Sequence, residues 1–99
     1  MLHIVHKSPF QTSALASCLR LAQAGSALLL IEDGVYAATT GSAAEPRMRE
    51  ACGRLKVYAL KPDLDARGVA AKVVEGVTLV DYAGFVDLAV QYPTSQSWL

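Results

Sequence analysis

The stretch "ALLLIED", residues 27 to 33, is an unbroken apolar run with two acidic residues at its end. An apolar run of this kind is typical of a central parallel strand that is covered on both faces. It is far shorter than the roughly 20 residues that a membrane-spanning helix needs. The stretch therefore predicts a buried strand, and its acidic residues would lie at the carboxyl edge, where α/β sheets bind ligands.

Further apolar segments predict strands, and the segments between them predict helices. The expected strands are residues 2 to 6, 27 to 33, 56 to 60 and 77 to 80. The expected helices run from Thr12 or Ser13 to about Ala24, from Arg47 to Cys52, and over residues 63 to 68 and 81 to 90. Four strands separated by crossovers indicate one α/β domain, residues 1 to 99, with a mostly parallel sheet and helices on both faces.

The composition excludes several classes of protein. Of 99 residues, 53% are hydrophobic and 18% are charged, which suits one small domain. The N-terminus lacks the charged region and apolar stretch of a signal peptide, so we expect a cytoplasmic protein with no membrane partner. Two cysteines, Cys18 and Cys52, are too few for a disulfide framework or a zinc site. We therefore expect reduced thiols, no metal and no cofactor.

The charge balance argues against direct binding of nucleic acid of any kind. Nine basic residues offset nine acidic ones, whereas affinity for nucleic acid depends on concentrated Lys and Arg. One local basic cluster consists of Arg47, Arg49, Arg54 and Lys56. Its positive charge is reduced by the neighbouring Glu45 and Glu50. Such a run usually forms a solvated face.

Cys18 lies in the first predicted helix. At 100° per residue it falls near the middle of an apolar arc, formed with Ala14, Leu15, Leu19, Leu21 and Ala22. The thiol is then either a small hydrophobic filler or a persulfide carrier, which would need access and an activating cation. Arg20 lies on the opposite side of the helix, and Lys7 or His6 could reach the thiol only if the first loop folds over the helix. We expect Cys18 to react sluggishly.

Other chemistry-bearing residues give weaker signals. Cys52 ends a helix, where carbonyl partial charges disfavour a thiolate. His3 and His6 face opposite sides of one strand, so they cannot share a metal there. Asp33 and Gly34 occupy the ligand-binding edge, but no glycine-rich phosphate loop follows, so Asp33 can equally be a capping residue.

Four aromatic residues are of types enriched at protein interfaces: Tyr36, Tyr82, Phe85 and Trp98. Core packing explains Tyr36 and Phe85 equally well. Trp98 follows the polar run "PTSQS" and has little local chain to cover it, so we expect it to dock onto a partner.

Six blocks of sequence carry a resemblance to a known family. They are, in order, "LHIVHKSPF", "SCLRLA", "LLLIEDGVYAA", "KVYALKPDLDARG", "LVDYAGFVDL" and the terminal "QSWL". Together they span nearly the whole chain, and their order and separations resemble the TusB/DsrH family of small sulfur-relay proteins.

The resemblance implies a DsrE-like α/β fold and a role as the smallest of three related subunits in a heterohexamer with two copies of each. Such a complex relays persulfide sulfur between cysteines and on to a downstream sulfur-carrier protein. In the Tus branch the sulfur serves 2-thiolation of the wobble uridine of tRNA, and in the Dsr branch it serves sulfur oxidation. The blocks "KSPF", "SCLRLA" and "VDYAGFVDL" slightly favour the Dsr branch.

The resemblance also places the principal carrier cysteine on a TusD/DsrE-like partner, with a TusC/DsrF-like subunit as the second partner. Cys18 matches a cysteine that DsrH-like members carry and some TusB-like members lack, which makes it a candidate secondary sulfur carrier. Whether the chain is itself an enzyme stays open. Two alternatives remain, a small-ligand-binding flavodoxin-like module and a freestanding thiol enzyme with an exposed Cys18.

Overall fold

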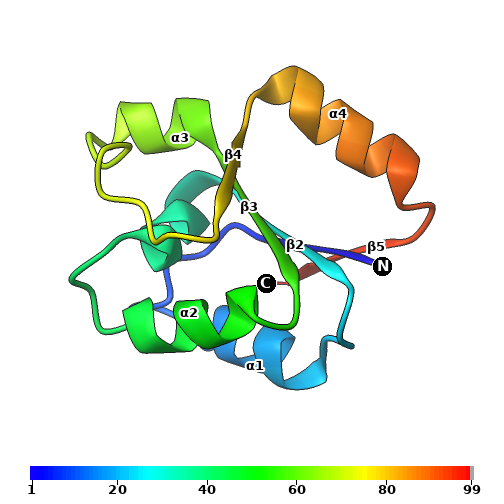
Figure 1. Cartoon of the computed structure of the whole chain (residues 1–99), viewed down its shortest axis with the longest axis horizontal. Coiled ribbons are helices and arrows are strands. Elements are labelled where there is room, and N and C mark those ends of the chain that lie inside the picture. Colours follow the sequence, from blue (N-terminus) through cyan, green and yellow to red (C-terminus); the bar gives the residue numbers. More distant parts are fainter. Residues whose placement is uncertain (99) are drawn as a thin grey trace.

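The computed structural model describes residues 1–98 and consists of one five-stranded sheet with helices around it (Figure 1). The strands are β1 (Leu2–Val5), β2 (Ala27–Leu30), β3 (Lys56–Leu60), β4 (Thr78–Val80) and β5 (Ser95–Trp98). The helices are α1 (Ala14–Leu21), the 3-10 helix η1 (Glu32–Ala38), α2 (Glu45–Cys52), α3 (Lys61–Ala66) and α4 (Tyr82–Gln91). The strand order is β4-β3-β2-β1-β5 and every pair is parallel.

The central strand is β2, as the opening stretch predicts, and all four of its residues are buried. It is shorter than expected, because the acidic residues that follow belong to η1. The first helix also ends earlier than expected, at Leu21, and Ala22 is already extended. Gly25 then turns the chain toward β2 with a φ of +87°, a conformation that favours glycine.

Side chains of successive strand residues enter two separate apolar clusters, one on each face of the sheet. The larger cluster lies under α1, α2, η1 and α3, and includes Leu28 and Leu30 from β2. The smaller cluster contains Ala27 and Leu29 from the same strand, together with Leu88 from α4. In Figure 1, α1 and α2 lie below the sheet and α4 lies on its other side. The prediction of a parallel sheet with helices on both faces is confirmed.

The fifth strand was not expected from the sequence. β5 lies beside β1, pairing Leu2 with Ser95 and Val5 with Trp98. The sequence "SQSW" has no apolar run that would predict a strand. An edge strand does not need one, since its polar side chains can stay in solvent. The half-buried ring of Trp98 packs against the larger cluster, and its Nε1 donates a hydrogen bond to Nδ1 of His3 at 3.1 Å. The cover on Trp98 therefore comes from β1, which is distant in sequence, and the docking of its half-buried ring onto a partner stays a prediction.

Candidate functional site

Cys18 lies in the middle of α1 and points into the larger cluster. Its side chain is 0% exposed, and Leu15, Leu19 and Ala22 are buried with it. The predicted apolar arc is confirmed for these positions, while Leu21 at its rim is 61% exposed. The structure thus places the candidate carrier thiol inside the protein.

Burial dominates the chemistry of this thiol. It raises the pKa of Cys18 from 9.0 to about 11, because the thiolate would lose its hydration in the core. The nearby positive charge of Arg54 acts in the opposite direction but does not offset the burial. At neutral pH the side chain is therefore a protonated thiol, not the nucleophilic thiolate.

Arg54 is the cation that sequence reasoning missed. It follows α2, and its Nη1 donates a hydrogen bond to the carbonyl oxygen of Ala22 at 2.9 Å, while Nη2 donates to the carbonyl of Leu19. These carbonyls lie in the last turn of α1 and at the residue that caps it, where backbone acceptors have no partner within the helix. Arg54 thus links the end of α1 to the end of α2. The prediction that the basic cluster forms only a solvated face is therefore wrong for Arg54.

The carboxyl edge beside β2 is occupied by an ion-pair network. Asp33 pairs with Arg67 through Oδ1 and Nη2 at 2.9 Å, and Asp63 accepts a hydrogen bond from the backbone N–H of Glu32 at 2.6 Å. Gly34 is packed so closely that a Cβ there would lie 2.2 Å from the carbonyl oxygen of Val5. The residues predicted as a possible ligand edge therefore hold η1 against α3 and β1. The Asp33 carboxylate pairs with Arg67 and makes no capping hydrogen bond to η1, so the capping interpretation is not supported.

The remaining candidates are separate from Cys18. Cys52 is half-buried at the end of α2, and burial raises its pKa. His3 is buried, which lowers its pKa, and His6 is half-buried at the end of β1. Across residues 1–98, no three His, Cys, Asp or Glu side chains gather closely enough to hold a metal ion. In the same part of the chain no helix is long and apolar enough to cross a bilayer.

The fold and the site together define a small parallel α/β protein with one deeply buried thiol and one sheet face under a single helix. The family described as "DsrH like protein" matches residues 7–95. Protein TusB of Escherichia coli strain K12 is 43% identical over 98 residues, covering 99% of this chain and 100% of that protein. Protein TusB of Shigella flexneri is 41% identical with the same coverage. The chain belongs to the DsrH/TusB family.

Solved structures support the fold alone, because their sequence identities are low. The crystal structure of the ychN protein from E. coli matches with a TM-score of 0.85 at 18% identity, covering 98% of this chain and 97% of that one. The protein of unknown function MTH1491 from Methanobacterium thermoautotrophicum matches with a TM-score of 0.74 at 19% identity. That match covers 97% of this chain and 95% of the other.

Proposed function

We propose that this chain is an accessory subunit of a sulfur-relay complex, in which persulfide sulfur passes between cysteines of different proteins. Membership of the DsrH/TusB family supports the relay, and the similarity to proteins named TusB favours tRNA thiolation over sulfur oxidation. This preference replaces the slight Dsr preference of the sequence blocks. A formal net charge of zero supports contact with tRNA through another subunit.

The observation that carries the proposal is the outer surface of α4. Tyr82, Val86 and Val90 recur every fourth residue on one side of this helix, and they are 62%, 59% and 79% exposed. Ala83 and Ala89 are exposed as well, so the exposed part of α4 is mainly apolar. We call these five residues the α4 surface. Contiguous apolar surface of this kind marks a protein–protein contact.

The sheet beneath α4 adds to this surface. Among residues 1–98, Leu88 of α4 is the one helical side chain buried in the smaller cluster. Several apolar side chains around this cluster are therefore only half-buried: Ile4, Ile31, Tyr58, Val80, Phe85 and Tyr92. A partner that covers α4 would also bury part of this face. We infer that homologous subunits, TusC/DsrF-like and TusD/DsrE-like, dock here in a heterohexamer.

The protonated, buried Cys18 supports a principal carrier cysteine on a partner subunit. A freestanding thiol enzyme would need a thiolate within reach of its substrate, and Cys18 is 0% exposed. A ligand-binding module would need an open edge at Asp33, which is paired with Arg67. Both alternatives are therefore weaker than the subunit assignment.

Assembly is tested by co-expression with the two homologous partners and native mass measurement. The Val86→Asp/Val90→Asp variant is expected to lose assembly while keeping its circular dichroism spectrum. The matched control is Phe10→Asp/Leu21→Asp, which places the same charge on exposed apolar positions away from α4. A stable monomer indifferent to both partners, or equal assembly of the two variants, would refute the proposal.

The role of Cys18 in relay is tested in the assembled complex. We expect Cys18→Ala and Cys18→Ser to reduce sulfur delivery less than removal of the carrier cysteine on the partner. Persulfide loading is measured by mass spectrometry, and delivery by sulfur found on the acceptor protein. Abolished transfer in both variants with assembly intact would show that Cys18 is itself an essential carrier.

A further inference from the structure

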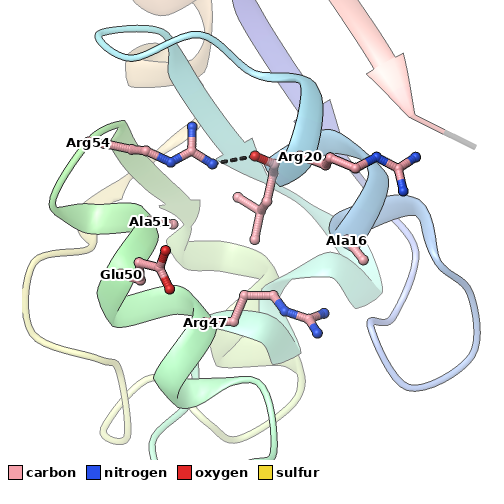
Figure 2. A pocket seen from close by; sticks show the side chains of 7 residues that line it. Ala16, Arg20, Arg47, Glu50, Ala51 and Arg54 are labelled. Atoms are coloured by element: carbon pink, nitrogen blue, oxygen red, sulfur yellow. Dashed lines mark hydrogen bonds between the residues drawn. The ribbon is translucent and has the colours of Figure 1, made fainter.

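A hollow of about 450 Å³ lies between α1 and α2, on the side of the sheet opposite to α4. Its charged lining consists of Arg20 from α1, and Arg47, Glu50 and Arg54 from α2 and the turn that follows it. Figure 2 shows these side chains around the hollow, with Arg54 and Glu50 on one side and Arg20 on the other. We call this site the arginine groove.

Two arginines that line the groove, Arg20 and Arg47, form no ion pair with a carboxylate within residues 1–98. Arg49 pairs with Glu45 at 2.7 Å and Arg67 pairs with Asp33, whereas no carboxylate within residues 1–98 lies at ion-pair distance from Arg20 or Arg47. Both side chains are exposed. Arg20 and Arg47 both line the hollow, and each guanidinium group can bind a carboxylate through two parallel N–H donors.

Arg54 makes the groove a preorganised feature of the fold. Its two bonds to the carbonyl groups of Leu19 and Ala22 hold the guanidinium group at one wall. They also set the end of α1 against the end of α2, so the two helices that carry Arg20 and Arg47 have a fixed spacing. The spacing of the two helices is therefore set before an anion binds, and only the side chains of Arg20 and Arg47 must be ordered on binding.

The rest of the lining selects the kind of anion. Ala16, Leu19 and Ala51 give the groove an apolar component, and Glu50 contributes a negative charge. A phosphate backbone carries neither a basic group that could pair with Glu50 nor an apolar side chain for this lining. A protein segment can supply carboxylates, apolar groups and a basic partner for Glu50.

We propose that the arginine groove binds an acidic segment of another protein, whose carboxylates pair with Arg20 and Arg47 and whose apolar side chains contact Leu19 and Ala51. The proposal is independent of the sulfur-relay assignment, because it rests on the charges and shape of this chain alone. It also concerns a different surface from the α4 surface.

The test uses the full chain and two labelled probes, a helical peptide that combines Glu and Leu and the same peptide with every Glu replaced by Gln. We expect the Glu peptide to bind, to weaken as salt is raised, and to shift backbone NMR signals of α1 and α2. The Arg20→Glu/Arg47→Glu variant is expected to weaken binding at least about tenfold, because attraction becomes repulsion. The control, Lys7→Glu/Lys72→Glu, changes the net charge equally on exposed residues outside the groove and is expected to bind like the wild type.

Three outcomes would overturn the proposal. Equal binding of the Glu and Gln peptides would show that carboxylates are not recognised. Equal losses in the two charge-reversal variants would place the attraction outside the groove. Binding of a single-stranded RNA oligonucleotide that is tighter than peptide binding, and lost in Arg20→Glu/Arg47→Glu, would assign the groove to nucleic acid instead.

Discussion

Alkylation of Cys18 is expected to be at least about a hundredfold slower in the folded chain than in the unfolded one. The pKa of the thiol rises from 9.0 to about 11 on folding, and well below both values each pKa unit lowers the thiolate fraction tenfold. In free energy, two units correspond to a penalty on the order of 3 kcal/mol for the thiolate form. The complete burial of the side chain adds a steric barrier to this electrostatic one.

The assay is iodoacetamide labelling of a Cys52→Ser variant at pH 8, with and without urea, followed by mass spectrometry. The matched variant is Cys18→Ser, which retains the half-buried Cys52 thiol and is expected to be labelled faster than Cys18 in the folded state. The Cys18 rate should rise tenfold per pH unit between pH 7 and pH 9, since the thiolate fraction does so below the pKa of about 11. Folded-state labelling of Cys18 at the unfolded rate, with the protein shown to be folded by circular dichroism, would refute this reasoning.

Three further predictions concern stability, each measured by urea unfolding. Gly34→Ala is expected to cost at least about 2 kcal/mol, because the new Cβ would lie 2.2 Å from the Val5 carbonyl oxygen and the backbone must shift; a loss below half of that would contradict the packing. Burial lowers the pKa of His3, so the unfolded state binds a proton on this residue more readily than the folded state does. The free energy of unfolding should therefore fall as the pH drops below about 6.5, and His3→Phe should reduce this pH dependence. Arg54→Met is expected to cost about 1–2 kcal/mol through two lost hydrogen bonds from a partly exposed charge, against less than about 0.5 kcal/mol for Arg49→Met; equal effects would refute the linking role of Arg54.

Local sequence pattern predicts the parts of this fold that depend on local apolar side chains. "ALLLI" identifies the central strand, and the helical arc correctly buries Cys18. β5 is different, because its residues become a strand through backbone pairing with β1 and not through an apolar pattern of their own. Long-range polar contacts are equally invisible in a local pattern. Arg54 binds Ala22 across 32 positions, and Arg67 binds Asp33 across 34.

The pairing of β5 with β1 gives the protein a built-in optical reporter. Trp98 is the one tryptophan in the chain, and its indole ring lies 6.0 Å from the imidazole of His3, measured between ring centroids. Intrinsic fluorescence excited at the tryptophan band therefore reports on the joining of residues 95–98 to residues 2–5. Closing a loop of this length is a slow, non-local step, so the emission change during refolding should lag behind the helical circular dichroism signal.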